Sequence, residues 1–154
     1  MILTVVSEIL IVFIVPMAAY AIDRRPSRLT KFMYSFFIAG MMIPFHLYMF
    51  PLFKEMKTFH IFSTMAGPIV SYIAGSVAFG TLLYCSFLKT VPVEIEEAAM
   101  IDGCSKYSIF VRIILPLLGP SIITTIVISF YWIWDDYMGP LLYLTKPALY
   151  TVSL

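Results

Sequence analysis

The stretch Glu97-Ala98-Ala99-Met100-Ile101-Asp102-Gly103 combines charged and small residues and ends in a glycine, and Ile113-Ile114-Leu115-Pro116 follows it at a short distance. The rest of the chain is strongly apolar, because 61% of its 154 residues are hydrophobic and only 12% are charged. An ordinary soluble domain has about 25% charged residues. We therefore interpret the chain as a membrane protein in which this stretch forms a water-exposed loop that meets a partner molecule.

Four hydrophobic segments each approach the roughly 20 residues that an α-helix needs to cross the hydrocarbon core of a bilayer. Membrane helices are expected over residues 1–22, 32–53, 61–88 and 117–134, with a connecting loop over residues 89–116. The predicted fold class is an all-α integral membrane protein in which about four transmembrane helices form a single domain over residues 1–154. Membrane lipid is therefore an expected partner.

The distribution of Lys and Arg predicts the orientation of these helices. Two connecting segments hold most of the cations, namely Arg24, Arg25, Arg28, Lys31, Lys89, Lys106 and Arg112. The segments on the other side hold Lys54, Lys57 and Lys146. Because cytoplasmic loops of membrane proteins carry the excess of cations, we place the loop at residues 24–31 and the loop at residues 89–116 in the cytoplasm.

Small residues recur in the third hydrophobic segment. Gly67, Ser71 and Gly75 are spaced four apart, which places them on one face of a helix. This pattern is typical of closely packed membrane helices. We expect this face to pack against another helix, either within the chain or in a partner subunit.

The loop at residues 89–116 is expected to fold as helix, turn and helix. Thr90 can cap a first helix, whose first turn contains Glu94. Gly103 can supply the left-handed residue that ends this helix, and Ser105 can cap a second short helix. The loop is therefore predicted to be an ordered docking element.

One face of the first loop helix favours a protein partner. Ile95, Ala98 and Ala99 are spaced three and four apart, and the two alanines allow another surface to approach closely. A helix lying on lipid headgroups is the alternative interpretation. The neighbouring glutamates, Glu94 and Glu97 among them, would be repelled by anionic lipid, so we favour the protein partner.

Composition and motifs disfavour several classes of function. The formal net charge is only +1, so the chain lacks the basic surface of a nucleic-acid-binding protein, and no nucleic-acid partner is expected. Cys85 and Cys104 lack the spacing of metal ligands, and the sequence has no phosphate-binding glycine loop with its lysine. We therefore predict no metal, no cofactor and no catalytic residue, and we disfavour a membrane enzyme or a channel.

The order of the loop motifs resembles the EAA loop in permease subunits of binding-protein-dependent ABC importers. Glu97-Ala98-Ala99 is followed after three residues by Gly103, and after nine more by Ile113-Ile114-Leu115-Pro116. The string that begins at Val91-Pro92, together with Trp132-Ile133-Trp134-Asp135-Asp136-Tyr137, is similar to the carbohydrate-uptake branch, which includes maltose-type and multiple-sugar permeases. The resemblance extends over the whole chain.

This resemblance implies the MetI-like fold of a type I ABC importer, with the EAA loop as a coupling helix that docks on a cytoplasmic ABC ATPase subunit. The implied contact residues are Glu94, Glu97, Ala98, Ala99, Asp102 and Gly103. The other implied partners are a second permease subunit and an extracytoplasmic solute-binding protein, in the plasma (inner) membrane of a prokaryote. ATP hydrolysis would then take place in the partner, so the chain itself is not expected to be an enzyme.

The implied function is that of a multi-pass permease subunit in an ATP-driven sugar importer. Measured against the family pattern, the chain begins inside an early core helix and stops before the final membrane helix, so the resemblance implies a domain truncated at both ends. Two alternatives stay open. One is an ABC permease for another solute, such as a polyamine or phosphate, and the other is a truncated permease fragment that does not function.

Four residues are candidates for the solute path. Glu8 lies inside a predicted span, where an ionisable side chain usually faces the bundle interior or a wet cavity; the alternative is a site near the outer interface with no specific role. Trp134 belongs to an aromatic cluster that resembles an interfacial belt. Its alternative role is to stack on a sugar, with Asp135 and Asp136 accepting hydrogen bonds from the sugar hydroxyls.

Overall fold

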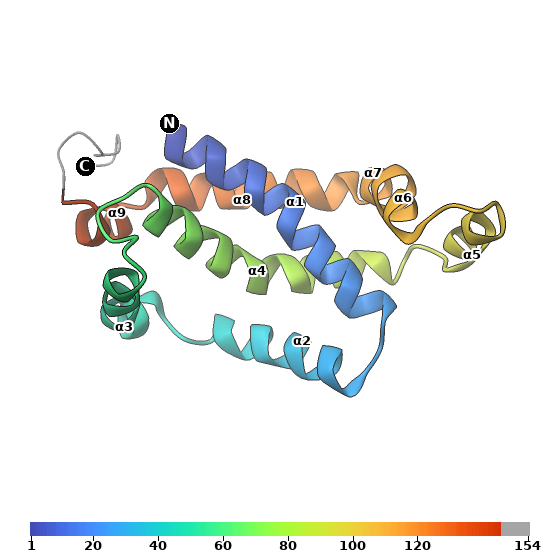
Figure 1. Ribbon diagram of the computed structural model, residues 1–154, viewed down its shortest axis with the longest axis horizontal. Helices are drawn as coiled ribbons and strands as arrows, with labels where there is room; N and C mark the ends of the chain where they lie inside the picture. Colours follow the sequence, from blue (N-terminus) through green and yellow to red (C-terminus); the bar gives the residue numbers. More distant parts are fainter. Residues whose placement is uncertain (146–154) are drawn as a thin grey trace.

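The computed structural model describes residues 1–145, and within that range the chain forms helices joined by turns and short loops, with no β-strand. The helices that run alongside one another across the molecule (Figure 1) are α1 (Ile2–Arg24), α2 (Arg28–Met41), α4 (Ala66–Leu88) and α8 (Gly119–Asp135). The predicted all-α fold class is confirmed. Lys146, one of the cations in the charge pattern, lies outside the described range.

The other elements lie at the two ends of this bundle (Figure 1). One end holds α3 (Phe45–Thr58) and α9 (Met138–Tyr143). The other end holds α5 (Glu94–Ile101), α6 (Lys106–Ile109), a π-helical turn (Phe110–Ile114) and α7 (Leu115–Leu117). The connection from α1 to α2 lies at the same end as α5, so the two cation-bearing loops are on one side, as their predicted cytoplasmic location requires.

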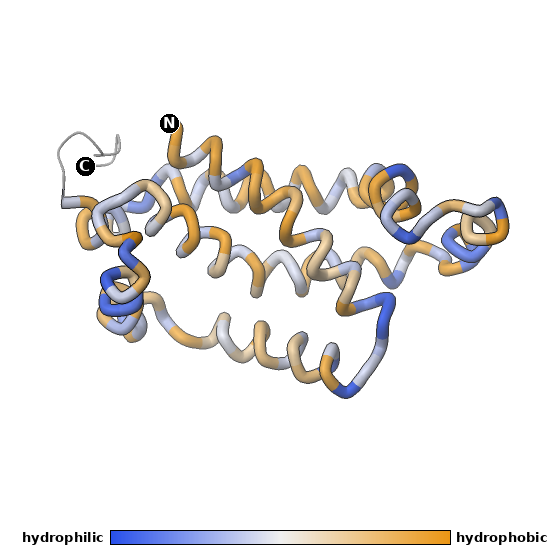
Figure 2. The backbone as a smooth tube through the Cα atoms, in the orientation of Figure 1, coloured by the Kyte–Doolittle hydropathy of each residue, from blue (hydrophilic) through white to orange (hydrophobic). Residues whose placement is uncertain are grey.

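Two helices, α1 and α4, are each long and apolar enough to cross a membrane, with mean hydropathy of 2.5 and 1.5. Apolar residues extend along both helices in Figure 2. Two further pairs meet this requirement only when combined: α2 with α3, bent by 111°, and the segment from α6 to α7 with α8, bent by 72°. By length and composition, the described residues therefore offer between two and four spans, and the upper number agrees with the prediction.

Residues 32–53, which hydropathy predicts as one membrane helix, are divided between α2 and α3. The break ends at Pro44, whose backbone has φ −59° and ψ 139°. A proline disfavours helical backbone in the residue before it and provides no N–H to continue the helical hydrogen bonds. The chain therefore turns sharply here. The other three predicted segments correspond to α1, α4 and α8, with shifts at their ends.

The hydrophobic core lies where α1 packs against α4. Val15 and Ala19 of α1, and Tyr84 and Leu88 of α4, have no exposed surface. Gly80 of α4 makes this packing possible, because a Cβ at that position would collide with Cγ1 of Val15. The close approach of the two helices therefore depends on a glycine, as in many membrane helix pairs.

The predicted small-residue face of α4 does not carry this contact. A Cβ built at Gly75 would meet no neighbouring atom within 4 Å, whereas the Cβ of an alanine at Gly80 would meet α1. Within the described residues, α4 therefore packs on α1 through Gly80 and not through Gly75. Packing of the Gly75 face against a partner subunit stays a prediction.

Candidate functional site

The loop between α4 and α8 begins with a turn that closes α4. The hydroxyl of Thr90 donates to the carbonyl oxygen of Phe87 at 2.7 Å, and the backbone N–H of Thr90 donates to the same oxygen at 2.9 Å. The prediction that Thr90 caps the following helix is therefore wrong, because its hydroxyl is engaged by the end of α4. Helix α5 begins at Glu94 instead, and its first turn holds three glutamates, where carboxylates stabilise the positive end of the helix dipole.

Helix α5 ends in the turn that the sequence predicts. Gly103 has φ +83°, and its N–H donates to the carbonyl of Met100 at 3.1 Å. The next N–H, from Cys104, donates to the carbonyl of Ala99 at 3.0 Å, which completes a Schellman motif. Helix α6 then starts at Ser105, whose hydroxyl oxygen accepts a backbone N–H at 3.2 Å. The predicted order of helix, glycine turn and helix is confirmed.

Most of the predicted contact residues lie on the free surface of α5 and its turn, namely Glu94, Glu97, Ala98, Asp102 and Gly103. The sixth, Ala99, is 7% exposed and packs into the core. Residues three apart share a side of a helix, so Ala99 faces inward together with Glu96. Ile101, which no sequence pattern marks as a contact residue, is 86% exposed at the end of the helix.

The inward-facing Glu96 joins α5 to α1. Its carboxylate is 5% exposed and accepts two short hydrogen bonds from side chains of α1. The hydroxyl of Tyr20 donates to Oε2 at 2.5 Å, and Nε of Arg24 donates to Oε1 at 2.6 Å. Glu96 is therefore a structural anchor, while its neighbours Glu94 and Glu97 are exposed.

Arg24 extends this connection to the end of α4. Its Nη2 donates to the carbonyl of Leu88 at 3.2 Å and to the carbonyl of Val91 at 2.9 Å, and Nη1 lies 3.3 Å from Oδ2 of Asp23. One guanidinium thus links α1, the end of α4 and α5. We call Tyr20, Arg24 and Glu96 the anchor cluster. The sequence places Arg24 and the loop glutamates on the same side of the membrane, but nothing in their spacing pairs Arg24 with Glu96.

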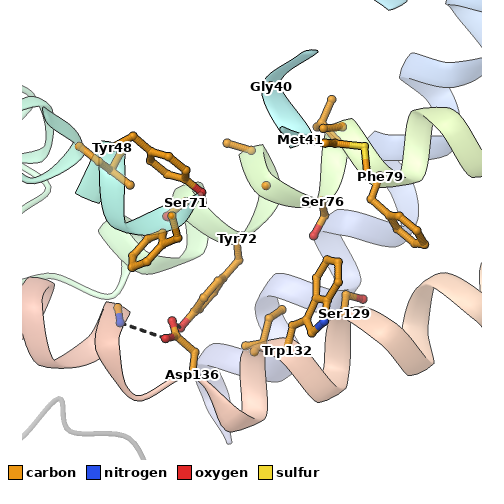
Figure 3. Close-up of a pocket in the computed structure, with 18 of the residues that line it drawn as sticks. Gly40, Met41, Tyr48, Ser71, Tyr72, Ser76, Phe79, Ser129, Trp132 and Asp136 are labelled. Carbon is orange, nitrogen blue, oxygen red and sulfur yellow. Dashed lines mark hydrogen bonds between the residues drawn. The ribbon is translucent and has the colours of Figure 1, made fainter. Parts of the chain in front are cut away.

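A groove of about 1020 Å³ lies toward the opposite end of the bundle, between α2, α3, α4, α8 and α9. Most of its lining is aromatic or aliphatic. Figure 3 shows Tyr72 reaching from α4 toward Asp136 and Trp132 projecting from α8 toward α4. Tyr143 also lines the groove, and its buried hydroxyl has no hydrogen-bond partner among the described residues. Burial, with smaller effects from Tyr48 and Asp136, raises the pKa of Tyr143 to about 12, so this hydroxyl stays a donor.

Two of the four candidate path residues, Asp135 and Asp136, line this groove. Asp136 has a structural role as well, because its Oδ2 accepts from the hydroxyl of Tyr72 at 2.8 Å and its Oδ1 accepts from the N–H of Gly139 at 3.0 Å. The carboxylate therefore holds the start of α9 against α4.

Trp134 does not line the groove. It stacks on Phe130 along an exposed face of α8, with ring centroids 5.6 Å apart. Trp132 lines the groove instead, and its ring lies 5.8 Å from the ring of Phe79 on α4. Successive helical residues point about 100° apart, so two positions along the helix are enough to reverse the direction of the side chain.

Glu8 faces the interior of the bundle, as one of its two predicted interpretations requires. Its side chain is on α1, the residue is 9% exposed, and Oε2 lies 3.0 Å from Oγ of Ser129 on α8. Glu8 is not part of the groove lining, although Ser129 is. Whether Glu8 lies near the outer interface is a question of depth in the membrane, and that part of the prediction stays a prediction.

The sequence belongs with known transport proteins. Residues 3–154 match the family described as "Binding-protein-dependent transport system inner membrane component". The probable starch degradation products transport system permease protein AmyC of Thermoanaerobacterium thermosulfurigenes is 40% identical over 154 residues, which cover 100% of this chain and 56% of that protein.

Two further relatives show the same relationship. The multiple sugar-binding transport system permease protein MsmG of Streptococcus mutans is 36% identical over 99% of this chain and 56% of its own length. The melibiose/raffinose/stachyose import permease protein MelC of Bacillus subtilis is 33% identical over a stretch that covers 100% of this chain and 56% of its own length. The chain thus spans about half the length of the curated relatives it matches. It belongs to the family of binding-protein-dependent transport system inner membrane components.

Proposed function

We propose that this chain forms part of the permease subunit of an ATP-driven sugar importer in the plasma membrane of a prokaryote. The observation that carries the proposal is the geometry of α5, whose exposed face is free for a partner while Glu96 on its inner face is bound to α1. A loop that only connected two membrane helices would need neither feature.

The proposed partner at α5 is a cytoplasmic ABC ATPase subunit. The exposed carboxylates of Glu94 and Glu97 can pair with basic groups of such a partner, and Ala98 and Gly103 allow its surface to come close. Ile101 adds an exposed apolar side chain at the tip of the helix. ATP binding and hydrolysis would occur in that partner, because the role proposed for this chain is mechanical.

The anchor cluster connects α5 to the membrane helices, so that a movement of α5 can displace them. A displacement of α5 would be transmitted through Glu96 to Tyr20 and Arg24, and through the guanidinium to the end of α4. Because α1 and α4 are also packed closely at Gly80, they would move together as one unit. Rocking of this unit would contribute to the change between outward- and inward-facing states.

The groove is the proposed contribution of this chain to the solute path. Aromatic rings such as Trp132 can stack on the apolar face of a sugar, while Asp135 and Asp136 can accept hydrogen bonds from its hydroxyls. The names of the relatives, which refer to starch degradation products, multiple sugars and melibiose, support a carbohydrate solute. A second permease subunit and an extracytoplasmic solute-binding protein would complete the transporter.

Charge reversal on α5 tests the proposal in the complete permease, coexpressed with its partner subunits. Glu97→Lys should weaken binding of the ATPase subunit by about tenfold or more, equivalent to about 1.4 kcal/mol of binding free energy, and should lower both its copurification and sugar uptake. Glu55→Lys is the matched control, because Glu55 is an exposed glutamate on α3 at the opposite end of the bundle.

Two outcomes would contradict separate parts of the proposal. Equal copurification and uptake for the two variants would exclude α5 as the ATPase contact. Uptake of a polyamine or of phosphate, with no uptake from a panel of labelled oligosaccharides, would replace the sugar with another solute and leave the coupling role intact.

A further inference from the structure

The groove has charge of one sign only. Most of its lining is aromatic, aliphatic or small, while two carboxylates, Asp135 and Asp136, stand at the end of α8. Lysine, arginine and histidine are absent from the lining formed by the described residues. The groove therefore carries negative charge and has no positive charge of its own.

The two carboxylates differ in what they contact. Asp136 is bound by the hydroxyl of Tyr72 and by the N–H of Gly139, and Figure 3 shows Tyr72 reaching toward it. Asp135 is exposed and makes no hydrogen bond or ion pair with another described residue. The charge of Asp135 therefore acts directly on a molecule that enters the groove.

The position of Asp135 within α8 is unfavourable for an acid. Asp135 is the last residue of this helix, where the helix dipole has its negative end. No basic residue in the last turn offsets this effect. Local rules of this kind are broken most often at functional sites, so a carboxylate at this position favours a role in the groove.

The cations on α3, which lies at the same end of the bundle, do not line the groove. Nζ of Lys57 lies over two aromatic rings, 4.4 Å from the centroid of Phe53 and 5.2 Å from that of Phe62. Lys54 is exposed on the same helix and is also absent from the lining. Among the described residues both salt bridges are made by Arg24, so none of these cations pairs with Asp135.

A second polar group in the groove suits a solute with hydroxyl groups. Tyr143 lines the groove and is only 1% exposed, and its hydroxyl has no hydrogen-bond partner among the described residues. A buried hydroxyl is costly unless another group bonds to it. The hydroxyl of a sugar can accept this hydrogen bond, whereas a neutral phenol supplies no charge to offset an anion.

We propose that Asp135 is a specificity-determining residue that makes the groove bind uncharged solutes and reject anions, including phosphorylated sugars and phosphate. The proposal rests on the proposed role of the groove in the solute path. An anion would give up water and meet the carboxylate of Asp135, whereas the hydroxyls of a neutral sugar can donate to the same oxygens. Of the two alternative solutes, phosphate is disfavoured by this charge and a polyamine is not.

The fluorescence of Trp132 measures the charge next to Asp135. Trp132 lines the groove three residues before Asp135, which places the two side chains on one side of α8. In the complete permease complex, the fluorescence that is lost in Trp132→Phe is the signal of this tryptophan. The ratio of its quenching constants for caesium and iodide should fall about twofold in Asp135→Asn, because the cation is then attracted less and the anion repelled less.

Glu55→Gln is the matched control for the quenching experiment. Glu55 is an exposed acid on α3, at the same end of the bundle, and it does not line the groove. This variant removes the same charge and should leave the quenching ratio unchanged. A wild-type ratio in Asp135→Asn would overturn the proposal, and so would an equal fall in Glu55→Gln.

Binding of solutes to the purified complex tests the selection itself. In the absence of the solute-binding protein, a labelled glucose trisaccharide should bind at least about fivefold more tightly than the same trisaccharide carrying one phosphate. Asp135→Asn should narrow this difference, and Glu55→Gln should not. Equal binding of the two saccharides to the wild type would overturn the proposal.

Trp132→Ala distinguishes a failure of this inference from a failure of the proposed solute path. If the variant binds the neutral trisaccharide more weakly while the wild type binds both saccharides equally, the groove stays in the solute path and the charge selection is overturned. If the variant binds the neutral trisaccharide as tightly as the wild type does, the groove is excluded from the solute path, and the charge selection is overturned with it.

Discussion

Glu96 and Glu8 are both buried glutamates that bind to other helices, but their surroundings differ. Both carboxylate oxygens of Glu96 are occupied, one by the Tyr20 hydroxyl and the other by the Arg24 guanidinium. Glu8 has a contact at one oxygen only, and the contact is a serine hydroxyl. The comparison shows how the neighbouring groups change the surroundings of one type of side chain.

The difference follows from what each environment can supply. At the loop end of the bundle, backbone carbonyls at the end of α4 are free to hold a guanidinium, so a charged carboxylate finds a charged partner. At Glu8, the neighbouring helix α8 offers a hydroxyl group, because the backbone groups inside a helix are bonded within it. The first carboxylate therefore has a charged partner, and the second has a neutral one.

Replacing glutamate by glutamine at each of the two positions tests this difference, and the larger effect is expected at Glu96. Glu96→Gln removes the closer of the two carboxylates beside the Arg24 guanidinium, so we expect a loss of about 3 kcal/mol in the free energy of unfolding. Denaturant titration of the complete permease in detergent measures this. Glu94→Gln is the control, because Glu94 is exposed two residues before Glu96, and it should have little effect. Equal stability of Glu96→Gln and wild type would show that the anchor cluster is not a stabilising ion pair.

The packing of α1 on α4 supports both glutamates, so weakening it should affect both sites. Gly80→Ala would place a methyl group against Val15, and overpacking of this kind costs about 1–3 kcal/mol. Gly75→Ala is the control, because its methyl group would meet open space. Thermal unfolding of the two variants measures the difference. A Gly80→Ala protein as stable as Gly75→Ala would mean that the two helices can separate without cost.

Glu8→Gln should give the smallest effect and sharpen the contrast with Glu96→Gln. A glutamine side chain has nearly the shape of a glutamate and keeps an oxygen that can accept from Ser129. We expect a change below about 1 kcal/mol in the free energy of unfolding, the scale of one neutral hydrogen bond. The same denaturant titration checks it. A loss as large as that of Glu96→Gln would show that Glu8 contributes more than this neutral hydrogen bond.

In the loop, predictions that depend on neighbouring residues were more reliable than predictions of contacts between residues distant in the sequence. Gly103 and Ser105 could be assigned from the sequence, because a helix stop and a helix cap depend on a few adjacent residues. Thr90 could not, since its hydroxyl could serve either the end of α4 or the start of α5, and packing decided between them. Glu96 was missed because its partners are 72 and 76 residues away.

Side-chain direction was the other source of error. The sequence located the aromatic and acidic cluster near the end of α8, but it could not say which tryptophan faces the groove, because the direction of that face depends on where α4 lies. Trp132 faces it and Trp134 does not. The same reasoning applies to α4, where Gly80 and not Gly75 meets α1.

The sequence by itself determined the all-α membrane character, the number of apolar segments and the helix–turn–helix order of the loop, because hydropathy and capping are properties of short stretches. Only the tertiary structure decided which glutamate anchors α5, which tryptophan lines the groove, and that Glu8 meets Ser129. These outcomes depend on the rotation and spacing of helices that are distant in the sequence. In this bundle, that arrangement is set by the fit of Val15 against Gly80 and by the hydrogen bonds of one arginine.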